Sequence, residues 1–137
     1  MEGLPNEFSE VLFSAAKPMG GWPPKFAVVT AHNPDGVLTD GAENDRADEL
    51  LRDELVRSNL IHFRVVGGSR DGKHQEAGWG IEVNEILAAN RLSKRFGQLA
   101  FFWITEGQLF LVNTKTGKRQ FQAVWIERLL NSTDSDQ

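Results

Sequence analysis

Two polar residues directly after a predicted buried strand are the first candidates for chemistry in this sequence. His32 and Asn33 follow the continuous apolar run at 26–31, so both stand where a strand ends. An imidazole beside an amide can serve as a general base with an orienting partner. Asn33 can instead close an Asx-type turn ahead of Pro34, whose ring presets φ for a turn. Both interpretations stay open, and the turn is favoured.

Glu76 is the next candidate, because it stands at the entry to the predicted strand at 77–83 and close to Trp79. A carboxylate beside an aromatic wall can act as a general acid or base. Alternatively, Glu76 accepts hydrogen bonds from backbone groups or from Asn44 and holds the preceding loop in place. The structural role is favoured.

Asn44 and Gln98 are amides at the ends of predicted helices. Asn44 lies three residues before Ala47 and seven before Leu51, so helical spacing places it on the inward face. An unpaired buried amide costs about 1–3 kcal/mol, so Asn44 needs partners. Gln98 follows the helix-ending Gly97 and can either bind a ligand or satisfy carbonyl groups at the helix end.

The leading hypothesis gathers these side chains around one polar pocket. Amides and one carboxylate beside aromatic rings suit a neutral or mildly cationic polar ligand, or a peptide end, better than a phosphate. We therefore predict a small binding module for a small molecule or a peptide. The predicted binding residues are His32, Asn33, Asn44, Glu76, Trp79, Gln98 and Phe101.

Two alternatives belong to other functional classes. A hydrolase-type enzyme would use Glu76 as base and His32 as its helper, and would need the two side chains within a few ångström of each other. An interaction protein would instead bind nucleic acid or an acidic partner through two small basic clusters. Nucleic acid is not favoured, because phosphate binding usually needs a larger basic footprint. The basic residues concerned are Arg91, Lys94, Arg95, Lys118 and Arg119.

The elements that must position these residues follow a β-α-β-β-α-β order with an added hairpin. This order predicts an α+β, ferredoxin-like (split βαβ) sandwich, with a mostly antiparallel sheet, two helices on one face and an extra C-terminal hairpin. A dimer formed through a sheet edge is a further expectation. Strands are expected at 26–31, 61–66, 77–83, 99–104 and 109–112, and helices at 7–16, 42–57 and 85–96.

Length and composition set the frame for this fold. The 137 residues predict an N-terminal extension (1–24), one α+β domain (25–130) and a disordered tail (131–137). The absence of cysteine excludes thiol nucleophiles and cysteine-ligated metals, and no metal or cofactor motif is present, so neither group is expected. The sequence has neither a signal-peptide pattern nor a membrane-spanning apolar run, which favours the cytoplasm. The net charge of −4 combines −6 over residues 1–60, +4 over 61–133 and −2 over 134–137.

Four short motifs in a fixed order resemble a bacterial family known as domain of unknown function 3293. The motifs are T-A-H-N-P at 30–34, E-N at 43–44, E-x-G-W at 76–79 and F-G-Q at 96–98. The resemblance covers roughly residues 24–112. That family commonly has a tryptophan or similar residue where this sequence has His32. Similarity of this kind implies one small α/β domain with a shared polar pocket and implies no activity.

Overall fold

A computed structural model of the 137-residue chain describes residues 10–130. No helix in that range is long and apolar enough to cross a lipid bilayer. The elements in chain order are β1 (Leu12–Ser14), β2 (Lys25–Thr30), η2 (Pro34–Gly36), α1 (Gly41–Arg57), β3 (His62–Gly68), β4 (Gln75–Glu82), α2 (Ile86–Arg95), β5 (Ala100–Thr105), β6 (Gln108–Asn113), β7 (Arg119–Val124) and η3 (Trp125–Arg128).

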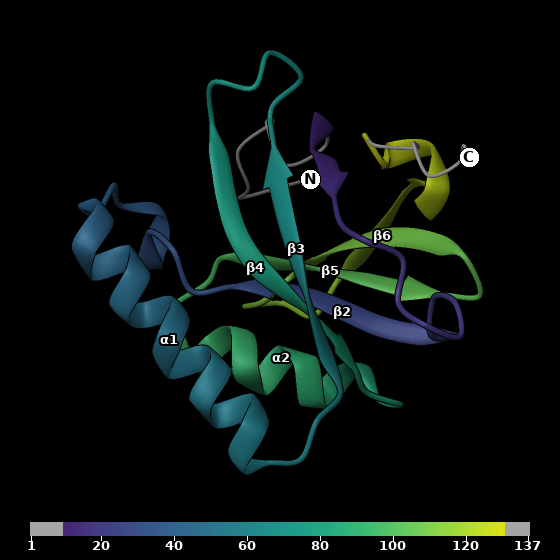
Figure 1. Cartoon of the computed structure of the whole chain (residues 1–137), viewed down its shortest axis with the longest axis horizontal. Helices are drawn as coiled ribbons and strands as arrows, with labels where there is room; N and C mark the ends of the chain where they lie inside the picture. The colour runs from purple at the N-terminus through teal and green to yellow at the C-terminus, as the bar shows by residue number, and fades with distance from the viewer. Residues whose placement is uncertain (1–9, 131–137) are drawn as a thin grey trace.

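The seven strands form one antiparallel sheet in the order β1-β3-β4-β2-β5-β6-β7. The sheet is curled, so β3 and β4 stand steeply in Figure 1 while β2, β5 and β6 run across the view. Both helices lie on one side of this sheet. The predicted α+β class, with an antiparallel sheet and two helices, is confirmed. The finer assignment to a ferredoxin-like sandwich stays a prediction.

The core under the helices is built from alternate residues of the central strands. Ala27 and Val29 of β2 and Ile81 of β4 face the helices, as period-two alternation requires. Leu51 and Leu55 of α1 are fully buried against them, which accounts for the leucine stripe in the sequence. This stripe fixes which face of α1 meets the sheet and leaves its charged face toward solvent.

Within residues 10–130, neither α1 nor α2 covers the opposite face of the sheet, which is closed by the curl of the sheet and by Trp125 of η3 (Figure 1). Phe26 of β2 lies at the centre of an aromatic cluster with Trp22, Phe63 and Trp125, at ring-centroid separations of 6.0, 5.4 and 5.3 Å. Such ring pairs contribute about 0.5–1.5 kcal/mol each beyond the burial of their surface. The chain therefore has a second hydrophobic core on this face.

The two ends of the described chain meet at the rim of the curl. Phe13 of β1 forms an isolated parallel bridge with Leu129, and the Leu130 N–H donates to the Phe13 carbonyl at 2.7 Å. The Arg128 guanidinium donates to the Val11 carbonyl at 3.1 Å. Segments more than a hundred residues apart in sequence thus close the aromatic core together.

The helix expected over residues 7–16 is wrong for the part that the structure describes. Leu12–Ser14 are β1 and pair with residues 66–68 of β3. A short isolated helix is marginal in water, whereas a strand at this edge buries Phe13 to 1% exposure. Residues 7–9 of that expected helix, and the expected disordered tail at 131–137, lie outside the described residues.

Gly80 of β4 makes room for the Phe63 ring, and its replacement tests this packing. A Cβ at Gly80 would lie 2.3 Å from the Phe63 ring, so Gly80→Ala should lower the free energy of unfolding by about 1–3 kcal/mol, as overpacking does. Urea denaturation measures the change. Gly41→Ala is the matched control, because a Cβ at Gly41 meets nothing within 4 Å. Equal effects of the two substitutions would contradict the packing argument.

Glu54, on the last turn of α1, links the C-terminal ends of both helices. Its carboxylate accepts hydrogen bonds from Arg57 at 2.5 Å and from Ser58 at 3.1 Å, and pairs with Arg95 of α2 at 3.2 Å. The hydrogen bond from Arg57, followed by that from Ser58, lowers the pKa of the Glu54 carboxyl. Stability from a lowered carboxyl pKa is present above the unfolded-state pKa and is lost as the pH falls through the folded-state pKa.

Glu54→Gln should therefore be less stable than the parent protein at pH 7, and the difference should shrink as the pH falls below the ordinary glutamate value of 4.5. Urea denaturation at pH 7, 5 and 3 measures it. Glu49→Gln, on the same helix and without an ion pair in the described chain, is the control. A stability difference for Glu54→Gln that stays constant with pH would contradict this assignment.

Candidate functional site

Asn33 and Asn44 join the end of β2 to the start of α1 by reciprocal hydrogen bonds. The Asn33 backbone N–H donates to the Asn44 Oδ1 at 2.9 Å, and the Asn44 Nδ2 donates to the Asn33 Oδ1 at 3.1 Å. Asn33 has a left-handed backbone (φ 50°), which asparagine tolerates better than most residues. The expected turn is present, since the Gly36 N–H donates to the Asn33 carbonyl at 3.0 Å, but it is not of the Asx type, because the Asn33 Oδ1 accepts from the Thr39 N–H at 2.9 Å.

Glu76 and Thr39 complete this junction cluster, which we define as Asn33, Thr39, Asn44 and Glu76. The Asn33 Nδ2 donates to the Glu76 Oε2 at 2.9 Å, and the Asn44 Nδ2 also donates to the Thr39 carbonyl at 3.2 Å. Both amide protons of Asn44 and its carbonyl oxygen are therefore engaged within the protein. Most of the hydrogen-bonding capacity of the cluster is used to hold the β2–α1 connection to β4.

Gln98 ties the C-terminal end of α2 to the same connection. Its Nε2 donates to the His32 carbonyl at 3.0 Å and to the Phe96 carbonyl at 3.1 Å. The Gly97 carbonyl accepts from the Asp35 N–H at 2.6 Å. Of the two roles that the sequence leaves open for Gln98, the geometry corresponds to the satisfaction of carbonyl groups at a helix end.

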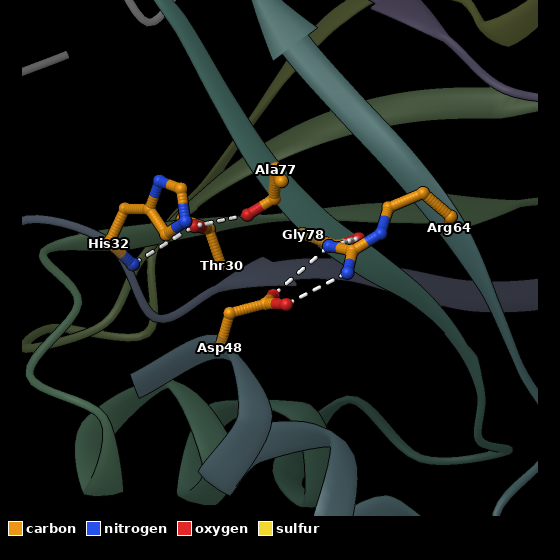
Figure 2. Close-up of polar contacts among 6 residues, drawn as sticks. All are labelled: Thr30, His32, Asp48, Arg64, Ala77 and Gly78. Carbon is orange, nitrogen blue, oxygen red and sulfur yellow. Dashed lines mark hydrogen bonds and ion pairs between the residues drawn. The ribbon is translucent and has the colours of Figure 1, made fainter. Parts of the chain in front are cut away.

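The other predicted binding residues lie in different surroundings. His32 is half-buried; its backbone N–H donates to the Thr30 hydroxyl, which donates to the Ala77 carbonyl (Figure 2). No hydrogen bond joins the His32 ring to Glu76 within residues 10–130. Phe101 is 1% exposed and packs in the core under the helices.

Trp79 alone among the predicted residues borders an open groove between α1 and the strands β3 and β4. The groove has a volume of about 580 Å³ and is bounded on one side by the charged face of α1. Trp79, on β4, forms part of the floor and is half-buried. The lining residues are Asp45, Asp48, Glu49, Arg52, His62, Arg64 and Trp79.

Arg64 spans this groove from β3 to α1 (Figure 2). Its two terminal nitrogens donate to the two carboxylate oxygens of Asp48 at 3.0 and 2.8 Å, and one of them also reaches the Gly78 carbonyl at 3.1 Å. The guanidinium lies 3.8 Å from the centroid of the Trp79 ring. A bidentate pair stacked on an aromatic ring is a well-oriented arrangement for arginine, so the groove floor is held in one geometry.

His62 forms the other side of this floor, and its tautomer follows from its contacts. The His62 Nδ1 lies 2.8 Å from the Leu60 carbonyl, which can only accept, so Nδ1 carries a proton. In the neutral ring Nε2 is then an acceptor. The imidazole meets Trp79 edge to face, with 5.3 Å between ring centroids. The Trp79 Nε1 is buried and has no hydrogen-bond partner within the described chain.

The remaining lining charges have no partner among residues 10–130. Asp45 and Glu49 are exposed carboxylates, and Arg52 is an exposed guanidinium, one to two turns apart along α1. None of the three takes part in an ion pair within this range. Because Asp48 neutralises Arg64, the groove presents two carboxylates and one cation to a ligand. In the same range, no three His, Asp or Glu side chains are grouped to hold a metal ion.

The basic residues considered for nucleic acid lie elsewhere. Arg95 on α2 pairs with Glu54 of α1. Arg119 on β7 lies over the Phe110 ring, at 5.6 Å from its centroid. Neither residue lines the groove.

Sequence reasoning missed six of the seven groove residues, although a signal for them exists. Asp45, Asp48, Glu49 and Arg52 recur at helical spacing along one face of α1, beside the leucine stripe. His62 and Arg64 alternate along β3 and therefore share one face of the strand. Nothing in the sequence indicates that these two faces meet.

Comparison with known protein families identifies the family to which this chain belongs. A family described as "Protein of unknown function (DUF3293)" matches residues 29–101, which is more than half of the chain. The match confirms the resemblance carried by the four short motifs. No curated protein and no solved structure matches the chain.

The junction cluster should behave as a structural brace when one amide is removed. Asn44→Ala leaves the Asn33 N–H and the Thr39 carbonyl without partners, so it should lower the free energy of unfolding by about 1–3 kcal/mol. Urea denaturation measures the loss. Asn84→Ala, an exposed asparagine just before the other helix, is the matched control and should cost far less. An unchanged stability of Asn44→Ala would contradict the brace.

Proposed function

The chain belongs to the DUF3293 family, and we propose that it is a binding domain whose groove between α1 and the strands β3 and β4 takes a polar ligand that carries positive charge. The binding module expected from the sequence is thereby kept, while its site moves from the junction cluster to the neighbouring groove. The junction cluster positions α1 and so helps to form one wall of that groove.

One contrast supports this proposal above all others. The amides of the junction cluster are engaged with each other, whereas Asp45, Glu49 and Arg52 of the groove have no ion-pair partner within the described residues. A groove floor that is already ordered, beside charged groups without partners, favours ligand binding. The protein then loses little conformational entropy when the ligand binds.

The charge pattern of the groove favours a cationic ligand. Two unpaired carboxylates, Asp45 and Glu49, outnumber the single unpaired cation, Arg52. The His62 Nε2 is a further acceptor, since Nδ1 is the protonated nitrogen. An ammonium or guanidinium group can donate to all three acceptors. Arg52 adds a place for a carbonyl or carboxylate on the same ligand.

The lining favours binding over catalysis. Its carboxylates and its imidazole are of types that can act as nucleophiles, but none of them is hydrogen-bonded to a general base within residues 10–130. The hydrolase alternative would need His32 and Glu76 to cooperate, and the contacts of both residues lead to other partners. A binding role requires only the charges and the floor that are already in place.

The order of the central strands supports a finer proposal about the fold. The order β3-β4-β2-β5 is antiparallel throughout, and β4 lies between the two strands that α1 connects. This arrangement is what a split βαβ core requires, so we propose that these strands and both helices form a ferredoxin-like core extended by β1, β6 and β7.

The proposal predicts binding of single cationic residues at the groove. N-acetyl-arginine amide and N-acetyl-lysine amide should shift the NMR signals of His62, Arg64 and Trp79, whereas N-acetyl-glutamate amide should not. The variant Asp45→Asn with Glu49→Gln should bind about tenfold more weakly, which corresponds to about 1.4 kcal/mol for two surface charges.

Asp53→Asn is the matched control, because Asp53 is exposed on the same helix and does not line the groove. It should bind like the parent protein. If neither cationic amide shifts the groove signals at any concentration up to solubility, the proposed function is wrong.

A further inference from the structure

One half of β3 has an open edge beside the groove. β1 pairs only with residues 66–68 of β3, and within residues 10–130 no other strand pairs on that side. Residues 62–65 are therefore hydrogen-bonded to β4 on one side and unpaired on the other. In Figure 1, β1 accordingly lies beside only the C-terminal end of β3, at its arrowhead.

The backbone groups that face this edge can be identified. The Glu82 N–H donates to the Ile61 carbonyl, so position 61 is hydrogen-bonded toward β4. Hydrogen-bonding direction alternates along an antiparallel strand. His62 and Arg64 consequently direct their backbone N–H and C=O groups toward the open edge, where β1 would pair if it were longer.

This edge lacks the protection that natural edge strands usually have. Exposed edges are commonly blocked by a charged side chain, a proline or a bulge. Arg64, the only ionic residue in this half of β3, is folded over Trp79 and neutralised by Asp48. Ile61, just before the strand, is 66% exposed. The open half of β3 is therefore able to accept another strand.

A strand added here would extend the groove floor. Neighbouring strands lie about 4.8 Å apart, and their alternate side chains share one face. The side chains on the helix side of an added strand would lie next to His62 and Arg64, along the open side of the groove. Long basic side chains at these positions can reach Asp45 and Glu49, the unpaired carboxylates of α1.

We propose that the ligand of the groove is an extended basic peptide, which adds a strand to the open half of β3 and places alternate Lys or Arg side chains against the acidic face of α1. When the peptide adds as a strand, main-chain hydrogen bonds to His62 and Arg64 provide affinity. The acidic side chains of the groove then select peptides with basic side chains. The inference rests on the proposed function, since it identifies the chemical class of the ligand at the same groove.

The probe is a synthetic peptide, acetyl-T-K-V-R-V-K-T-amide, in which every second residue is basic. It should bind at least tenfold more tightly than N-acetyl-arginine amide, and it should slow the hydrogen exchange of the His62 and Arg64 amides. The charge-reversed peptide acetyl-T-E-V-E-V-E-T-amide should bind at least tenfold more weakly than the basic one. The variant Asp45→Asn with Glu49→Gln should remove most of this difference, and Asp53→Asn should keep it.

Two N-methylated versions of the basic peptide test strand addition directly. Methyl groups on alternate backbone nitrogens, placed in one phase or in the other, block either the face that pairs with β3 or the face that points to solvent. One version should lose binding at least tenfold, and the other should keep it. This asymmetry distinguishes strand addition from a purely electrostatic contact.

Several outcomes would overturn the inference and leave the proposed function intact. One is equal binding of the two methylated peptides while the single-residue amides still bind at the groove. Another is equal binding of the basic and acidic peptides. A third is dimerisation in light-scattering measurements with no competition from the peptide, because the open edge would then belong to a second copy. Failure of the single-residue amides to bind would reject the proposed function itself.

Discussion

The placement of α1 over the sheet is the constraint on which the rest of this structure depends. At its N-terminal end, Asn33 and Asn44 exchange two hydrogen bonds and fix how the chain leaves β2. One turn further along α1, the Asp48 carboxylate accepts hydrogen bonds from both terminal nitrogens of Arg64 on β3. These two contacts, together with the leucine stripe, hold the helix in one orientation. The groove exists because α1 is fixed beside β3 and β4 and does not cover β3.

The two faces of the sheet are buried by different means, and this difference explains the curl. Helices cover one face, where small and branched side chains of β2 such as Ala27 and Val29 pack together with the large rings of β5. Within residues 10–130 neither α1 nor α2 lies over the other face, which is closed by the curl of the sheet together with Trp125 of η3. Aromatic rings around Phe26 fill that interior, and the contact between Phe13 and Leu129 closes its rim. Deep curvature on one side thus follows from the absence of a third layer.

The hydrogen-bonding state of each polar group is the basis on which we propose the groove, and not the junction cluster, as the binding site. The junction cluster looks in sequence like a binding site, but its amides hydrogen-bond to one another and to the backbone. Groups in this state stabilise a fold, because any ligand would have to replace bonds that are already made. The groove residues differ, since Asp45, Glu49 and the His62 Nε2 lie beside an ordered floor and can still accept hydrogen bonds from a ligand. We therefore expect a ligand to bind where polar groups still lack hydrogen-bond or ion-pair partners.

The sequence by itself determined the class of fold, both helices, the run of central strands and the family, because hydrophobic periodicity and short motifs are local patterns. It also indicated that Asn44 faces inward and needs partners. Only the tertiary structure decided that residues 12–14 form a strand, since the burial of Phe13 depends on rings and a C-terminal segment far away in the chain. The tertiary structure likewise decided where the candidate groove lies, because Asp48 and Arg64 come from different elements, and their contact depends on how α1 packs on the sheet.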